Sequence, residues 1–243
     1  MLRALHVALI FLTTLPLPPV RAWREDDARR STRAYPLVGL VLGACLAAAW
    51  LLFGVFPDGL RGALLLGVGL LLTGALHFDG FCDVADAAFS SRSPPERQKI
   101  AKDPHFGVFA FAVGGVLLLV RAAALGALTQ PAALLVIPLL SRTLLLLPLA
   151  YGRVHGSSRL GRVAQPRPAE VWLPLSLGLG FTAVIGWWTE QLTVFLALAL
   201  AALFTMLALA WWLSSRLDGL GGDAYGALIE TTEAVMLTLA VLR

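Results

Sequence analysis

Charged residues and cysteines are both scarce in this chain. Only 14% of its 243 residues are charged, whereas soluble domains carry about 25%. The two cysteines, Cys45 and Cys82, are too few and too poorly placed for a disulfide framework or a thiolate metal centre. The chain also lacks a nucleic-acid-binding motif, an internal repeat and a second soluble region. These shortages exclude a soluble or disulfide-stabilised protein, and we expect no nucleic-acid partner.

Apolar residues, by contrast, are abundant. They make up 58% of the chain, and the mean hydropathy is +0.79. Seven segments have about the length of a helix that spans a bilayer, and they lie near 36–56, 61–78, 107–127, 131–150, 171–189, 191–213 and 226–242. Residues 1–20 are shorter and end in prolines, so we expect an interfacial or half-inserted helix there. The sequence therefore predicts an all-α, polytopic membrane protein.

The loops between these segments alternate in charge. Residues 21–33, 80–106, 151–170 and 214–225 carry nearly all charged side chains, whereas 57–61, 129–131 and 189–191 are short and nearly uncharged. Positively charged loops stay in the cytoplasm. We therefore expect a multi-pass protein of the cell inner membrane, with its acidic loops on the cytoplasmic side.

One stretch after the second apolar segment concentrates acidic residues. Asp79, Asp83 and Asp86 are spaced i, i+4 and i+7, which places their carboxylates on one face of a helix. Like charges this close repel each other, and a divalent cation would remove the repulsion. Hard oxygen ligands favour Mg²⁺ or Mn²⁺ over zinc. The alternative is a solvated helix end that carries three aspartates by chance.

The loop that follows supplies positive charge. Ser93 and Glu96 form a capping-box pattern, which predicts a short helix through Lys102 that ends at Asp103-Pro104. Asp103 is a candidate fourth ligand or general base. Gly80 would leave room for a phosphate, and the cations that could bind an anionic substrate are Arg92, Arg97 and Lys102. The alternative for these cations is an ordinary positively charged cytoplasmic loop.

Two arginines, Arg121 and Arg142, lie inside predicted spans. A charged side chain in the membrane is costly, so each should face a partner in the protein interior. A substrate phosphate or an acidic side chain would serve.

A glycine-rich turn near the C-terminus adds further candidates. Asp218 and Asp223 flank it, and Glu230 follows within the last predicted span, three residues before Glu233. We expect these acids on the same side of the membrane as Asp79, Asp83 and Asp86, although a flexible polar turn is the alternative.

His77 lies two residues before Asp79. It could orient an aspartate or contact phosphate, or it could be a structural histidine whose hydrogen bonds are satisfied within the protein.

Taken together, these motifs resemble the cobalamin synthase family, adenosylcobinamide-GDP ribazoletransferase, and the resemblance covers nearly the whole chain. Its markers are Phe11-Leu12-Thr13-Thr14-Leu15-Pro16, Tyr35-Pro36-Leu37-Val38-Gly39, His77-Phe78-Asp79-Gly80 with Asp83 and Asp86, Phe89-Ser90-Ser91-Arg92, Lys102-Asp103 with Gly107, Ser141-Arg142, and Asp218-Gly219 through Asp223, Gly226 and Glu230. One departure is Ala87, where the family usually has glycine after the third aspartate.

The resemblance implies a single membrane-embedded catalytic domain over 1–243. Its reaction joins adenosylcobinamide-GDP to alpha-ribazole or its 5'-phosphate, with Mg²⁺ as cofactor, and yields adenosylcobalamin or its 5'-phosphate and GMP. In this interpretation Asp79, Asp83 and Asp86 bind the metal, and Asp103 or Asp86 acts as the base. The residues expected to bind substrate are His77, Gly80, Arg92, Arg97, Lys102, Arg121, Arg142, Asp218, Asp223 and Glu230.

Other functions use similar residues. A membrane prenyltransferase also binds Mg²⁺-diphosphate with aspartate pairs, but its first motif has no Asp-Gly opening. A CDP-alcohol phosphotransferase would have Ala-Arg where this chain has Asp83-Val84. A transporter would need broken helices in paired halves, for which the sequence offers no convincing pattern. The ribazole form, the number of metal ions and the oligomeric state, including a homo-oligomer, stay open.

Overall fold

The computed structural model describes residues 1–103, 105–156 and 158–242 of the chain. Apart from an isolated bridge between Val154 and Leu220, these residues form no β-structure, which confirms the all-α prediction. Five helical segments are long and apolar enough to cross a membrane, or six if a bent helix pair counts as one span. The protein is therefore a multi-pass membrane protein, but the predicted number of seven spans is not confirmed.

The helices that pass this length and composition test follow the predicted segments closely. They cover 27–55 with α3 (Tyr35–Leu52), then α7 (Val108–Ala127), α8 with α9 (Ala132–Leu144 and Leu146–Tyr151), α11 (Pro168–Trp188) and α12 (Leu192–Leu217). The bent pair is α4 (Asp58–Thr73) with α5 (Leu76–Phe89), and the last helix is α13 (Gly222–Ala240). Three acidic residues lie on α13, at positions 223, 230 and 233, and this helix is not among the five.

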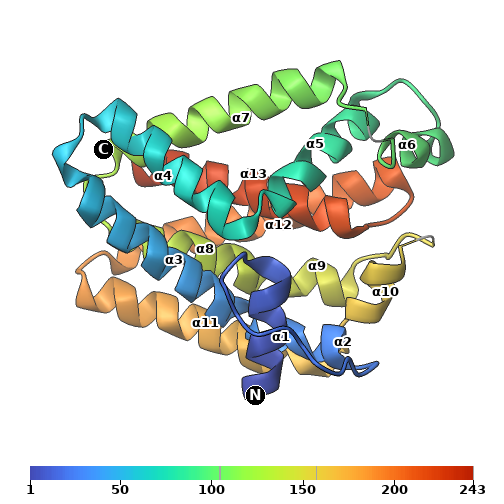
Figure 1. Cartoon of the computed structure of the whole chain (residues 1–243), viewed down its shortest axis with the longest axis horizontal. Helices are drawn as coiled ribbons and strands as arrows, with labels where there is room; N and C mark the ends of the chain where they lie inside the picture. Colours follow the sequence, from blue (N-terminus) through green and yellow to red (C-terminus); the bar gives the residue numbers. More distant parts are fainter. Residues whose placement is uncertain (104, 157, 243) are drawn as a thin grey trace.

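Short helices complete the fold. They are α1 (Leu2–Leu12), α2 (Asp27–Ser31), α6 (Pro94–Ile100) and α10 (Arg159–Ala164), together with the 3₁₀ turns Thr32–Ala34 and Phe53–Val55. In Figure 1, α5, α6, α9 and α10 all lie toward one end of the molecule. The loops with most of the charge are thereby gathered at that end, as the alternating charge pattern predicted.

Helix α8 lies at the centre of the bundle, and every one of its residues except Leu135 is buried. It packs most closely against α3, where Gly39 and Gly43 face its backbone. A Cβ atom on Gly43 would lie 2.6 Å from the Leu134 carbonyl oxygen, so only glycine permits this approach. The Gly-x-x-x-Gly spacing of the sequence therefore does mark a close helix contact.

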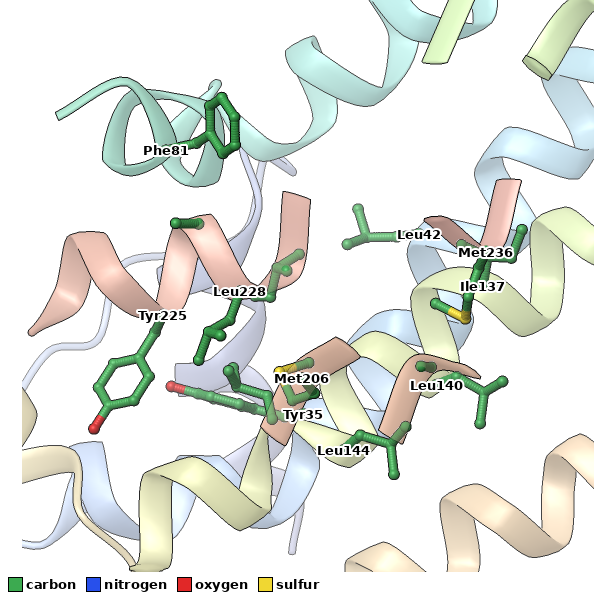
Figure 2. Packing of buried hydrophobic residues seen from close by; sticks show 14 of the residues in the cluster. Tyr35, Leu42, Phe81, Ile137, Leu140, Leu144, Met206, Tyr225, Leu228 and Met236 are labelled. Carbon is green, nitrogen blue, oxygen red and sulfur yellow. The ribbon is translucent and has the colours of Figure 1, made fainter. Parts of the chain in front are cut away.

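The hydrophobic core fills the space around α8. Figure 2 shows Ile137 of α8 beside Met236 of α13, within the buried cluster that also contains Leu140, Leu144, Met206 and Leu228. Burial of such side chains contributes about 25 cal/mol per Å² of apolar surface where water is the alternative. Between lipid-embedded helices, close packing has to take over that role.

The second predicted span, 61–78, is not one straight helix. Helix α4 ends at Thr73, and the chain turns through Gly74 and Ala75, whose φ angles are 60° and 54°. Helix α5 then leaves at 94° to α4. The freed carbonyl groups at the end of α4 are bound by Thr14, whose backbone N–H donates to Leu72 (2.8 Å) and whose hydroxyl donates to Leu71 (2.6 Å). The aspartates therefore lie on a separate helix after a sharp turn.

Two other local predictions can be compared with the structure. Helix α1 has 11 residues, about half of what a bilayer span needs. Arg3 ties it to the next loop by hydrogen bonds to the Asp27 carboxylate at 2.9 and 2.6 Å. The predicted capping box is confirmed at α6, where the Ser93 backbone N–H donates to Glu96 at 2.9 Å. The predicted end of this helix at Asp103-Pro104 falls partly outside the described residues.

Candidate active site

Helices α5 and α13 cross in direct contact through two glycines. A Cβ atom on Gly80 would lie 2.8 Å from the Cα atom of Asp223, and one on Gly226 would lie 2.8 Å from the carbonyl oxygen of His77. Each glycine thus removes the side chain that would hold the two helices apart. The open side of Gly80, which we expected to receive a phosphate, is filled by the backbone of α13.

This crossing brings three carboxylates together. Asp79 and Asp83 lie one turn apart on α5, and Asp223 lies in the first turn of α13. The charges of Asp79 and Asp223 both act on Asp83. We call Asp79, Asp83 and Asp223 the acidic site. Sequence spacing predicted the first two members, and the tertiary contact adds the third.

The carboxylates of the acidic site repel one another, and a nearby lysine offsets only part of this repulsion. Burial and the neighbouring Asp79 carboxylate raise the pKa of Asp223 above its usual range, and the Lys102 ammonium group opposes this shift. Lys102 thus lies near the acidic site, as the sequence predicted for a substrate-binding cation. Carboxylates held together against their own repulsion are typical of functional sites.

Asp86, the third aspartate of the sequence motif, has a different position. Its carboxylate accepts hydrogen bonds from the backbone N–H groups of Gly107 (2.8 Å) and Ala110 (2.9 Å), so it caps the N-terminus of α7. A carboxylate is stabilised there by the unpaired N–H groups and by the helix dipole. The structure therefore gives Asp86 a structural partner in α7, while its charge also acts on Asp83 in the preceding turn of α5.

The donor geometry of a closed metal centre is not preformed. Within residues 1–103, 105–156 and 158–242, no three His, Cys, Asp or Glu side chains converge closely enough to hold a metal ion. The predicted cluster of Asp79, Asp83 and Asp86 is thus not assembled in this form. The acidic site still offers hard oxygen donors that repel one another, which is the donor chemistry that suits Mg²⁺.

A second set of charged side chains is buried in the bundle, and we call it the buried ion network. Arg121 of α7 pairs with Glu230 and donates to Glu233 at 2.9 Å. Arg142 of α8 pairs with Glu233, and the Ser141 hydroxyl donates to the same carboxylate at 2.9 Å. Two arginines therefore face two glutamates.

The sequence allowed either a substrate phosphate or an acidic side chain as the partner of each arginine, and the structure shows acidic side chains. All four charged side chains are buried, with exposed fractions of 9% or less. The partners of Arg121 and Arg142 are acidic side chains of α13, and Glu230, which the sequence predicted to bind substrate, is paired with Arg121. The network joins α7, α8 and α13 in the membrane interior, where unpaired charges would be costly.

The predicted cations of the loop after α5 divide into two groups. Arg97 is 8% exposed, and its guanidinium donates to the carbonyl oxygens of Ser90 (3.3 Å) and Arg216 (3.2 Å). It therefore fastens α6 to the ends of α5 and α12. Arg92 is exposed, as is Lys102, so both side chains are accessible to an anionic substrate.

Two predicted acidic residues lie in exposed turns. Asp103 accepts hydrogen bonds from the backbone N–H (3.0 Å) and the Nδ1 atom (2.6 Å) of His105, and these bonds lower the pKa of its carboxyl group. Asp218 ends α12 with a φ of 56° and pairs with Arg153 at 2.9 Å. Neither residue is joined to the acidic site by these contacts.

His77 lies in the first turn of α5 and is only 4% exposed. Its Nδ1 atom is 3.4 Å from the Arg142 guanidinium, which makes a weak hydrogen bond to the buried ion network. Its Nε2 atom is buried and has no hydrogen-bond partner among the described residues. This histidine is therefore only half satisfied.

Sequence reasoning missed the central role of Glu233. Its spacing of three residues from Glu230 places both carboxylates on one face of α13, and this was the available signal. The packing role of Gly226 and the buried position of Tyr225 had no comparable signal. Both depend on which helix lies opposite them.

Known proteins match this chain over nearly its whole length. The family model described as cobalamin-5-phosphate synthase matches residues 4–241. Proteins named adenosylcobinamide-GDP ribazoletransferase are similar over nearly all of the chain. One from Deinococcus radiodurans is 40% identical over 97% of this chain and 84% of its own length. One from Stutzerimonas stutzeri is 42% identical over 98% and 97%, and one from Desulfitobacterium hafniense is 35% identical over 97% and 95%. No solved structure matches the chain.

Proposed function

Because the chain belongs to the cobalamin-5-phosphate synthase family, we propose that it joins adenosylcobinamide-GDP to alpha-ribazole or alpha-ribazole 5'-phosphate and releases GMP. The protein is then a transferase of cobalamin synthesis, as its similar relatives are named. The observation that carries the proposal is the meeting of Asp79, Asp83 and Asp223 beside Lys102.

The acidic site suits a magnesium-bound diphosphate. Asp79 and Asp83, with Asp223 across the helix crossing, would hold Mg²⁺ as oxygen ligands. Bound there, Mg²⁺ would neutralise the diphosphate oxygens and stabilise the leaving phosphate. Lys102, whose charge acts on Asp223, and the exposed Arg92 of the same loop would bind the phosphates of the donor.

The reaction exchanges one phosphorus–oxygen bond for another. A hydroxyl of the acceptor ribose attacks the phosphorus that carries the corrin arm. The bond from this phosphorus to the bridging oxygen breaks, and GMP leaves with the bond's electron pair. The hydroxyl proton passes to a carboxylate, for which a member of the acidic site or Asp103 is available. Lys102 would attract the phosphate oxygens while charge develops on the leaving group.

We further propose that the reaction occurs at the cytoplasmic face of the cell inner membrane. In the predicted topology, the four charged loops lie on the side that carries the acidic site, and they contain most of the Arg and Lys residues, as the positive-inside rule requires. The substrates and Mg²⁺ would then reach the acidic site directly from the cytoplasm. A homo-oligomer is compatible with this arrangement but is not needed to complete the acidic site.

The test is a reaction with purified protein in nanodiscs. Adenosylcobinamide-GDP and alpha-ribazole 5'-phosphate are supplied with and without Mg²⁺, and both GMP and the corrin product are measured. We expect both products in equal amounts and only with a divalent metal. Asp83→Asn should abolish them. The matched control is Asp58→Asn, because Asp58 is exposed at the start of α4.

Two results would contradict the proposal. One is product formation at the wild-type rate by Asp83→Asn. The other is no GMP with any divalent metal, in which case CDP-alcohol and prenyl diphosphate donors would be tested next.

A further inference from the structure

A cavity of about 140 Å³ lies next to the acidic site, on the side of α13 that faces α1, α9 and α10. Asp223 belongs to its wall, and Phe11, Tyr35 and Tyr225 line its apolar part. Figure 2 shows the rings of Tyr35 and Tyr225 on the same side of α13. A dry cavity of about 150 Å³ is large enough for one benzene ring. The cavity therefore has the size and the walls for a flat aromatic group.

Two polar atoms in this wall are buried and unpaired. The Nε2 atom of His77 and the hydroxyl of Tyr225 have no hydrogen-bond partner among the described residues, and both residues line the cavity. The exposed fractions are 4% for His77 and 8% for Tyr225. Burial of a polar group without a hydrogen-bond partner is unfavourable. A ligand that supplies a partner would recover part of this cost.

The neighbouring arginine determines which hydrogen-bonding role His77 can play. A guanidinium group can only donate hydrogen bonds, so the Nδ1 atom of His77 must accept from Arg142. In the neutral imidazole the proton is then on Nε2. The cavity lining therefore includes two residues with a buried, unpaired polar group, the N–H donor of His77 and the hydroxyl of Tyr225. It calls for a ligand with an acceptor and few other polar atoms.

We propose that this cavity binds the benzimidazole base of the nucleoside acceptor, an inference that rests on the proposed function. A benzimidazole that is bonded to ribose through one nitrogen keeps one free ring nitrogen, which is an acceptor, and is otherwise apolar. The guanine of the donor has several donors and acceptors, most of which would be left unpaired against Phe11 and the other apolar walls. With the base in this cavity, the ribose would extend toward Asp223 and the acidic site.

The experiment measures equilibrium binding of alpha-ribazole to the full chain in nanodiscs, without donor and without metal. Ala164 is buried in the cavity wall, so Ala164→Leu should fill part of the space. We expect binding to weaken at least about tenfold, because the ring loses apolar contact. The matched control is Ala169→Leu, because Ala169 is exposed at the start of α11. It should bind like the wild type.

A second variant tests the polar atoms without changing the volume. Tyr225→Phe removes only the hydroxyl, and we expect alpha-ribazole binding to weaken roughly threefold to tenfold. Binding of GMP, measured on the same samples, should not change in either variant. Thermal unfolding and gel filtration of each variant separate a loss of binding from a loss of folding.

The outcomes distinguish the two proposals. Unchanged alpha-ribazole binding by a folded Ala164→Leu variant overturns the base assignment, even if the wild type makes product. Weaker GMP binding in that variant would also overturn it and would place the guanine in this cavity. A wild-type protein that binds alpha-ribazole but releases no GMP contradicts the proposed function, and the base assignment is then supported by the binding data alone.

Discussion

The acidic site and the buried ion network contain similar residues under opposite electrostatic conditions. In the buried ion network, Arg121 and Arg142 balance Glu230 and Glu233, and each carboxylate has a charged partner. In the acidic site, carboxylates of α5 and α13 repel one another, and Lys102 acts on Asp223 from the loop. A balanced set holds helices together, whereas an unbalanced set at an accessible position is available to a cationic ligand.

The largest effect should come from breaking the balance in the buried ion network. Glu233→Ala removes the carboxylate that both arginines share and leaves a guanidinium buried without a full partner. We expect the free energy of unfolding to fall by about 3–5 kcal/mol. Thermal unfolding in detergent measures this loss. Glu233→Gln keeps the shape and should fall between wild type and Glu233→Ala; equal stability of all three proteins would contradict the structural role of the network.

Neutralising the acidic site should have the opposite effect on stability. Asp79→Asn removes one of the repelling carboxylates and should leave the folded protein at least as stable as the wild type without metal. Its turnover should fall by roughly 100-fold to 1,000-fold, as when one stabilising group is lost from a reaction centre. Steady-state GMP release and thermal unfolding are compared on one preparation. Lower stability together with normal turnover would reverse the assigned roles of the two regions.

The position of Asp86 gives an intermediate prediction. Asp86→Ala removes the cap of α7 and should lower the free energy of unfolding by about 1 kcal/mol. Asp86→Asn retains acceptor capacity and should cost less. Hydrogen exchange at the first turn of α7 locates the change. If instead Asp86→Asn abolishes turnover with α7 intact, Asp86 acts in the reaction in addition to its structural role.

The smallest effect is expected in the pH dependence of stability without metal. The pKa of Asp223 is raised in the folded protein. Its favourable contribution is therefore complete below the unfolded pKa of about 3.9 and is lost as pH rises through the folded value. In EDTA, the wild type should lose stability over this interval, and Asp223→Asn should lose less. The comparison is made by thermal unfolding at a series of pH values. If stability depends on pH identically in the wild type and in Asp223→Asn, Asp223 is not repelled by its neighbouring carboxylates.

A functional measurement sharpens the same comparison. Added Mg²⁺ should raise the melting temperature of the wild type, because a ligand that binds only the folded state stabilises it. Asp79→Asn should lose most of this shift, and Glu230→Gln should keep it, since Glu230 lies in the buried ion network. A shift that survives in Asp79→Asn would place the metal elsewhere.

Local sequence patterns were sufficient for many elements of the fold. The apolar segments predicted most helices within a few residues, because length and hydropathy are properties of the segment itself. The capping box at Ser93 was recognised for the same reason. The spacing of Asp79 and Asp83 also follows from helix geometry alone. Each of these features depends on residues that are near one another in the chain.

The turn at Gly74 and Ala75 could not be recognised in this way. Residues 61–78 read as one apolar span, but the chain bends sharply between α4 and α5 (Figure 1). The break depends on Thr14, which is about 60 residues away and binds the carbonyl groups at the end of α4. Asp86 is a similar case. Its spacing from Asp79 and Asp83 suggested a common ligand set, but its carboxylate faces the N–H groups of α7.

By itself, the sequence determined that this is a helical membrane protein whose acidic helix lies in a charged loop region, and its motifs determined the family. Only the tertiary structure decided which charges meet. It paired Arg121 and Arg142 with α13, moved Asp86 to the cap of α7, and brought Asp223 to Asp79 and Asp83. The physical reason is that helix periodicity is set by neighbouring residues, whereas electrostatic partners are set by the contacts between helices that are distant in the chain.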